Sequence, residues 1–185
     1  MVLKRAGIIL LALMITLMSA SCSSVNNKLK QNQLKDKLAI CSGYKVSLDV
    51  KNESTQYSFE FTRKKPLYYQ VEFSKPAEIK GFILEVNDKA VTLKYSGLSI
   101  PLDYMPFPIK TGIGRINDML INMDTLIEKY NVKQSDTNTI TLSGKINDDA
   151  DVEIKLRLSD SLPVGFKIVS SGKITDVTIN SFEFF

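Results

Sequence analysis

The sequence predicts an α+β fold of mainly antiparallel strands, in which an open, curved half-barrel wraps around one long and one short helix. The first observation behind this prediction is that successive segments alternate apolar and polar residues, as half-buried antiparallel strands do. The second is that residues 116–130 carry apolar side chains at helical spacing. A strongly curved sheet needs a cover for its concave face, and this amphipathic segment is the only sizeable candidate in the sequence.

The start of the chain predicts export and a lipid anchor. Residues 4–5 are basic, an apolar run covers 6–18, and small residues at 19–21 precede Cys22. This order is that of a secretory signal, and the apolar run is too short to be a membrane-spanning helix. A cysteine directly after the small residues is typical of a bacterial lipoprotein, although the usual leucine three positions earlier is a serine. We therefore expect residues 1–21 to be removed and Cys22 to carry lipid, which attaches the chain to a membrane outside the cytoplasm.

The rest of the chain is expected to form a tether and one domain. Residues 22–33, which include the lipidated end, are polar and rich in Asn, Gln and Lys, and this composition is typical of a tether. Residues 34–185 are long enough for a single domain with a full core. Its first element is a short amphipathic helix over 34–41, which Ser42 and Gly43 should end.

The alternating segments predict nine strands. In the first of them Tyr44, Val46 and Leu48 share one face, and polar residues lie between them. Gly97 and Pro101 loosen the alternation that follows the fifth segment. The nine segments are 44–50, 57–61, 67–73, 79–86, 91–95, 139–146, 152–158, 164–170 and 174–185.

Two apolar segments are candidate contact sites. The segment 103–109 is apolar but contains two prolines, so it forms either a loop that plugs the core or an exposed surface for a partner or a lipid. The last strand is long and β-prone, and a terminal strand of this kind either accepts a partner at its edge or exchanges between two copies in a strand-swapped homodimer. The candidate partner or dimer contacts are Tyr104, Met105, Phe107, Phe182, Phe184 and Phe185.

The composition excludes several classes of function. The chain has no histidine, which rules out Ser-His and Cys-His nucleophiles and zinc sites built on imidazole. We therefore expect no catalytic residues, no metal, no cofactor and no enzymatic activity. The net charge is +4 for the chain and +2 after residue 21, which is too mild for a nucleic-acid-binding protein. If Cys22 carries lipid, Cys41 has no partner in the chain, and its place on a helical face with Leu34 and Leu38 predicts burial.

Two segments in the middle third of the chain carry a family resemblance. They are the strand 67–73 followed by Lys75 and Pro76, and the hairpin 83–95, which ends in Tyr before a glycine. This pattern resembles the LolA/LolB-like lipoprotein superfamily and, within it, the GerS germination lipoproteins of spore-forming clostridia. The resemblance implies an eleven-strand half-barrel that holds helices in its concavity.

The resemblance also implies a function. GerS-like proteins bind and activate the cortex N-acetylmuramoyl-L-alanine amidase CwlD, which enables the muramic-δ-lactam modification of spore cortex needed for germination. The partner would be CwlD, and the protein would be anchored in the spore envelope.

The alternative is a LolA/LolB-like acceptor of lipids or lipoproteins, which requires an open hydrophobic cavity. The inward residues that could line such a cavity, or fill an ordinary closed core, are Tyr57, Phe59, Phe61, Tyr69, Val71 and Phe73.

Overall fold

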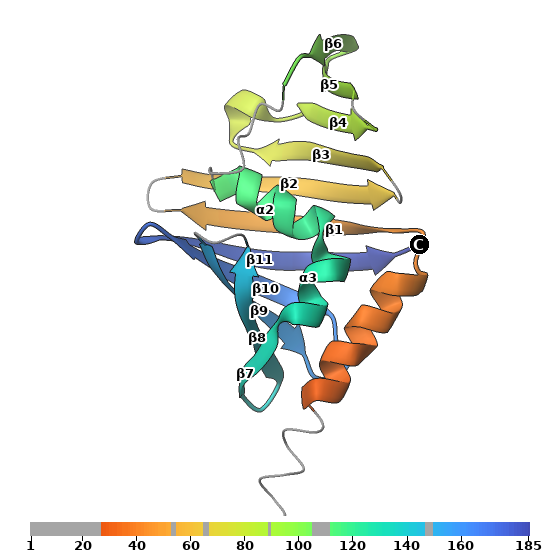
Figure 1. Cartoon of the computed structure of the whole chain (residues 1–185). Helices are drawn as coiled ribbons and strands as arrows, with labels where there is room; N and C mark the ends of the chain where they lie inside the picture. The colour runs from red at the N-terminus through yellow and green to blue at the C-terminus, as the bar shows by residue number, and fades with distance from the viewer. Residues whose placement is uncertain (1–26, 53–54, 65–66, 89, 105–111, 147–149) are drawn as a thin grey trace, which may run out of the picture.

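The described strands form one antiparallel sheet of 11 strands (Figure 1). The computed structural model describes residues 27–52, 55–64, 67–88, 90–104, 112–146 and 150–185. Neighbouring strands follow the order β6-β5-β4-β3-β2-β1-β11-β10-β9-β8-β7. The strands are β1 (Gly43–Asn52), β2 (Thr55–Lys64), β3 (Tyr68–Lys75), β4 (Ile83–Asn87), β5 (Ala90–Tyr95), β6 (Leu98–Leu102), β7 (Asn131–Ser135), β8 (Thr139–Ile146), β9 (Ala150–Arg157), β10 (Pro163–Ser170) and β11 (Lys173–Phe184).

The alternation seen in the sequence becomes the inner face of this sheet. Val46 pairs with Phe61 and Leu48 with Phe59 across β1 and β2, and all four side chains are buried. Each such pair removes apolar surface from water on one face only, while the polar residues between them remain on the other face. The sheet therefore has an apolar concave side and a polar outer side.

Helices fill the concave side. The α2 helix (Gly112–Ile121) and the α3 helix (Met123–Lys129) cross it, and the N-terminal helix, residues 27–40, lies at its border (Figure 1). A short 3₁₀ helix, η1 (Ala77–Ile79), precedes β4. The helical side chains that complete the core, each at most 1% exposed, are Ile116, Met119, Leu120, Met123 and Ile127. The predicted fold class, an open antiparallel half-barrel around helices, is confirmed.

Several elements differ from the prediction in their bounds. The long helix is divided at Asn122, whose side-chain amide donates to the carbonyl and to Oδ1 of Asp118 at 3.0 and 2.8 Å. Such bonds from a side chain to its own helix compete with helical geometry and favour a break. η1 occupies the start of the predicted strand 79–86, so β4 begins at Ile83.

Two strands of the structure did not appear among the nine predicted ones. β6 forms despite Pro101, because an edge strand tolerates a residue without an N–H group. β7 is at the opposite edge and has the mostly polar sequence NVKQS, which gives no alternation to detect.

The N-terminal segment is already helical at residue 27, the first described residue, well before the predicted start at Leu34. Its early turns are polar, yet Asn27 and Gln31 are only 9% and 1% exposed. Its early turns are therefore held by polar contacts, such as those of Gln31 with the Ile127 and Tyr130 carbonyls, which an apolar periodicity does not reveal. None of the described helices is long and apolar enough to cross a membrane.

The terminal strand β11 lies in the middle of the sheet. It pairs with β1 along Asn52–Tyr44 and with β10 along Ser170–Gly165, so both of its edges are occupied within the chain. In this arrangement the sheet's edges are β6 and β7 instead.

Candidate functional site

The described part of the concavity is a closed core. Phe59 and Phe73 pack with ring centroids 5.6 Å apart, and Phe61 stacks on Tyr69 at 5.9 Å. The three phenylalanines are at most 3% exposed and belong to the same buried cluster as the apolar side chains of α2 and α3. Burial raises the pKa of the Tyr69 hydroxyl to about 12. The aromatic residues that could have lined a lipid cavity therefore pack on one another and on the helices.

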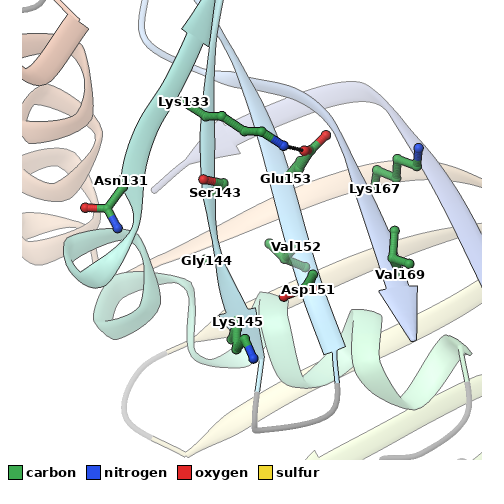
Figure 2. A pocket seen from close by; sticks show the side chains of 10 residues that line it. All are labelled: Asn131, Lys133, Ser143, Gly144, Lys145, Asp151, Val152, Glu153, Lys167 and Val169. Atoms are coloured by element: carbon green, nitrogen blue, oxygen red, sulfur yellow. Dashed lines mark hydrogen bonds and ion pairs between the residues drawn. The ribbon is translucent and has the colours of Figure 1, made fainter. Parts of the chain in front are cut away.

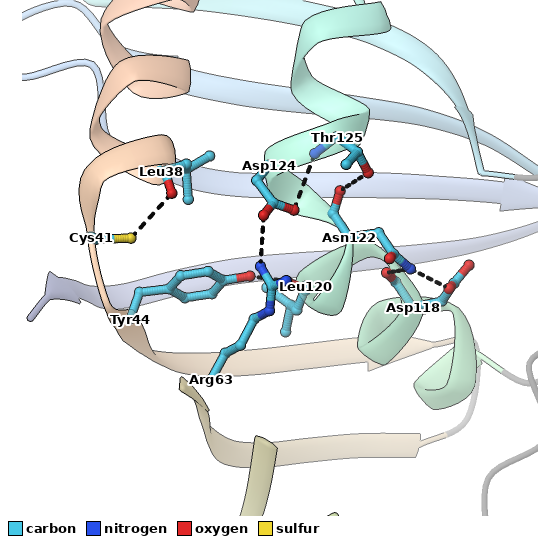
Figure 3. A network of polar contacts seen from close by, with 9 residues as sticks. All are labelled: Leu38, Cys41, Tyr44, Arg63, Asp118, Leu120, Asn122, Asp124 and Thr125. Atoms are coloured by element: carbon cyan, nitrogen blue, oxygen red, sulfur yellow. Dashed lines mark hydrogen bonds and ion pairs between the residues drawn. The ribbon is translucent and has the colours of Figure 1, made fainter. Parts of the chain in front are cut away.

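A polar contact joins the helices to the sheet inside this core (Figure 3). Tyr44 on β1 donates its hydroxyl to the carbonyl of Leu120 at the end of α2. Arg63 on β2 forms an ion pair with Asp124 on α3, with Nη1 and Oδ2 3.2 Å apart, and its guanidinium lies 5.9 Å from the Tyr44 ring centroid. Desolvation by burial raises the pKa of Tyr44 above its ordinary value. These contacts hold α2 and α3 against β1 and β2 and keep the core closed.

An apolar surface remains exposed at the β6 end of the sheet. The β5–β6 register places Val91 opposite Leu102, Leu93 opposite Ile100, and Tyr95 opposite Leu98, so all six side chains share one face. This face continues the inner side of β4, where Leu84 pairs with Leu93. We call these six residues the apolar strip: Val91, Leu93, Tyr95, Leu98, Ile100 and Leu102.

The apolar strip is far more exposed than the core next to it. Tyr95, Leu98 and Ile100 are 47%, 65% and 50% exposed, whereas Leu84 on the adjacent strand is fully buried. In Figure 1 α2 lies across β1 and β2, while β5 and β6 extend beyond it. Exposed apolar side chains gathered on one face mark a contact surface more often than isolated ones do.

The residues predicted as contacts near this end are only partly described. Tyr104 follows β6 directly and is 78% exposed. Met105 and Phe107 lie outside the described residues. The prediction missed Tyr95, Leu98 and Ile100. The signal that could have found them is the alternation that resumes after Gly97, which places both strands' apolar residues on one face of a hairpin.

The C-terminal phenylalanines divide between core and surface. Phe182 is 9% exposed and stacks on Tyr44 with ring centroids 5.3 Å apart, so its ring belongs to the core. Phe184 is half-buried, and Phe185 is 49% exposed. The Phe185 carbonyl accepts backbone hydrogen bonds from Ser42 and Gly43 at 2.9 and 3.1 Å, which ties the chain end to β1.

A hollow of about 500 Å³ opens beside this chain end. Ile40 at its rim is 85% exposed, and Cys41 is half-buried, with its thiol 3.3 Å from the Leu38 carbonyl. Its lining is Lys37, Ile40, Cys41, Ser42, Phe184 and Phe185. Cys41 thus packs against the core at the border of the hollow.

Polar hollows lie on the outer face of the sheet, one over β7–β10 (Figure 2) and another over β9–β11. The hollow over β7–β10 holds about 500 Å³, and its lining includes lysines 133, 145 and 167 together with Asp151 and Glu153. Lys133 and Glu153 form an ion pair across it. The positive and negative groups are interleaved, so this face offers no field of one sign to a charged ligand. Among the described residues, no group of three or more His, Cys, Asp or Glu could hold a metal ion.

Comparison with solved structures shows similarity in the fold. An uncharacterised conserved protein from Thermus thermophilus matches with a TM-score of 0.53 and 12% identity, over 85% of this chain and 86% of that one. A LolA superfamily protein from Nitrosomonas europaea matches at 0.45 and 10%, over 86% and 93%. The MucA/MucB complex of Pseudomonas aeruginosa matches at 0.47 and 9%, over 84% and 56%.

At these identities the likeness to the Thermus protein concerns the fold alone. No family model matches the sequence, and neither does any curated protein. The structure defines an antiparallel half-barrel whose sheet is open. Its own helices fill the concave side, and the apolar strip is exposed at one end.

Proposed function

We propose that the chain is an extracytoplasmic lipoprotein, anchored through Cys22, that binds a protein partner through the apolar strip and Tyr104. The observation that carries the proposal is the exposure of Tyr95, Leu98 and Ile100 on one face at the edge of the sheet. The signal segment and the position of Cys22 support the anchor.

A protein suits this surface better than a lipid does. A lipid chain needs an enclosed apolar cavity, and the described part of the concavity is packed with the chain's own side chains. The apolar strip is an open face, and Tyr95 adds an aromatic ring of the kind enriched at protein interfaces. Pro101 removes one backbone donor from β6, so we expect the partner to contact side chains rather than extend the sheet.

The partner that we propose is the amidase CwlD. The support for it is the resemblance of residues 67–76 and 83–95 to GerS-like lipoproteins, and the second of these segments includes part of the apolar strip. In this role the chain would activate the amidase at a spore membrane and so enable the cortex modification needed for germination. The catalytic histidines would belong to the amidase, since this chain has none.

A homodimer is a further part of the proposal. Exchange of β11 between two copies would recreate its pairs with β1 and β10 across the dimer. Phe184 and Phe185 at its end would then contribute contacts to the partner copy. Such an exchange needs the bonds of Phe185 to Ser42 and Gly43 to open first.

The experiment that tests the proposal is size-exclusion chromatography with light scattering on residues 23–185, alone and mixed with the soluble part of CwlD. We expect co-elution at a defined ratio, and the mass of the chain alone will show whether it is a dimer. The same fractions are extracted and searched for bound lipid by mass spectrometry.

The outcomes separate the two candidate functions. A stable complex with no lipid in the fractions supports the protein-binding function. A failure to co-elute, together with a stoichiometric lipid, would overturn it in favour of the lipid-acceptor alternative.

A further inference from the structure

The end of the molecule nearest the proposed anchor is basic. It consists of residues 27–35 of the N-terminal helix and residues 127–130 at the end of α3, and we call it the basic end. It contains four lysines and one glutamate, a net charge of +3. The lysines are Lys28, Lys30, Lys35 and Lys129.

Direct contacts hold these two segments together. Gln31 donates its side-chain amide to the carbonyls of Ile127 and Tyr130 at 2.6 and 2.5 Å, and Lys28 donates to the Gln31 side chain at 2.8 Å. Lys35 and Glu128 form an ion pair at 2.6 Å. Lys35 lowers the pKa of the Glu128 carboxyl, with smaller contributions from Lys129 and Lys28. The three lysines therefore surround one carboxylate on a single surface.

The tether is too short to hold this surface far from a membrane. Four residues separate Cys22 from Asn27, and a chain of that length spans at most about 18 Å however it is arranged. The described helix continues from residue 27 to residue 40, over about 20 Å at 1.5 Å per residue. The basic end is thus the part of the domain that the anchor places next to the lipid.

An exposed leucine lies within the basic end. Leu29 is 51% exposed and is flanked in sequence by Lys28 and Lys30. An apolar side chain between two lysines suits a membrane interface, because the leucine enters the headgroup boundary while the lysine chains reach back to the phosphates.

We propose that the basic end contacts an anionic lipid surface, with Leu29 at the headgroup boundary and Lys28, Lys30 and Lys129 at lipid phosphates. This inference rests on the lipid anchor of the proposed function. In this orientation the apolar strip, at the opposite end of the molecule in Figure 1, points away from the membrane and toward a partner.

The test is sedimentation of the mature chain, carrying Cys22→Ser, with vesicles of phosphatidylglycerol and phosphatidylcholine or of phosphatidylcholine alone. Because each lysine near an anionic surface adds to binding, we expect about tenfold or more stronger binding to the anionic vesicles at low salt, and little at high salt. Replacing Lys28, Lys30 and Lys129 together by glutamine should remove this preference. Leu29→Ser should weaken binding to the anionic vesicles several-fold.

The matched control replaces Lys75, Lys80 and Lys173 by glutamine, which removes the same charge from exposed positions elsewhere. If the control lowers binding as much as the first triple variant, or if both vesicle types bind equally, the inference is overturned. Circular dichroism confirms that all variants fold. The anchor is tested separately, by mass spectrometry of the N-terminal peptide of the membrane-extracted protein, so failure of the anchor and failure of the lipid-binding surface are distinguishable.

Discussion

Two buried tyrosines, Tyr44 and Tyr130, lie between the sheet and the helices, and their hydroxyl groups differ in whether they form a hydrogen bond. The Tyr44 hydroxyl donates to the Leu120 carbonyl, whereas the Tyr130 hydroxyl has no hydrogen-bond partner among the described residues. An unpaired buried hydroxyl costs stability, and a paired one contributes to it. Gly144 on β8 leaves room for the Tyr130 ring, because a Cβ at that position would overlap the ring.

The two tyrosines give opposite predictions for the same substitution. Tyr44→Phe should lower the free energy of unfolding by about 1–3 kcal/mol, because the Leu120 carbonyl loses its donor inside the core. Tyr130→Phe should leave stability unchanged or raise it by about 1 kcal/mol, since it removes an unpaired polar group. Urea unfolding followed by circular dichroism measures both. Equal losses in the two variants would contradict this assignment.

The close approach at Gly144 makes a further prediction. Gly144→Ala should destabilise the domain by about 1–3 kcal/mol, because the added methyl group forces the Tyr130 ring to move within a packed core. The double variant Gly144→Ala with Tyr130→Leu provides the matched control. If the overlap with the Tyr130 ring is the cause, Gly144→Ala will lower the free energy of unfolding less in the Tyr130→Leu background than in the wild type. Additive losses would show that the overlap is not the cause.

Burial also predicts how stability depends on alkaline pH. The pKa of Tyr69 is raised to about 12 in the folded chain, above the ordinary value near 10. Above about pH 10 the unfolded chain therefore loses tyrosine protons that the folded chain retains, and the free energy of unfolding falls as the pH rises toward 12. Urea midpoints at increasing pH should fall less for Tyr69→Phe than for the wild type, each compared with its own value at neutral pH. An equal fall would contradict this.

At the level of elements, the N-terminal helix shows why part of the structure escaped prediction. Its apolar half, around Leu34 and Leu38, was visible as a periodic pattern. Its polar half docks through polar side chains: Gln31 donates to carbonyls that α3 leaves open at its end, and Gln33 accepts from the Ser161 hydroxyl at 2.7 Å. A buried glutamine cannot be told from a solvated one in sequence. β6 and β7 were not predicted for a related reason: edge strands tolerate proline, as in β6, and polar runs, as in β7.

The docking of this helix is testable at Gln31. Gln31→Leu should lower the free energy of unfolding by about 2 kcal/mol, because the Ile127 and Tyr130 carbonyls lose their donor. Hydrogen exchange of residues 27–40 should accelerate more than that of the sheet. Asn32→Leu, at the exposed neighbouring position, is the control and should change neither quantity appreciably. Equal effects at both positions would show that the contact contributes nothing.

At the level of the whole molecule, the structure places two different surfaces at opposite ends. The basic end includes residue 27, where the described chain starts, and the apolar strip lies at the β6 edge (Figure 1). Alternation in the sequence was enough to predict the curved sheet and its helical cover, because the pattern determines which face is buried. For the apolar strip, alternation after Gly97 indicates only that its residues share one face; their exposure could not be predicted, because it depends on how far α2 and α3 reach across the sheet.

The most direct test of the central claim is the affinity of the chain for soluble CwlD, measured by titration calorimetry with variants of the apolar strip. Leu98→Asp with Ile100→Asp should weaken binding by about tenfold or more, because two charges enter an apolar contact. Ser99→Asp is the matched control, since Ser99 lies between the two residues on the other face of β6 and is also exposed. We predict tight binding for the wild type and for Ser99→Asp, with a large loss only in the double variant. No binding by the wild type, or the same affinity in all three proteins, would contradict the account.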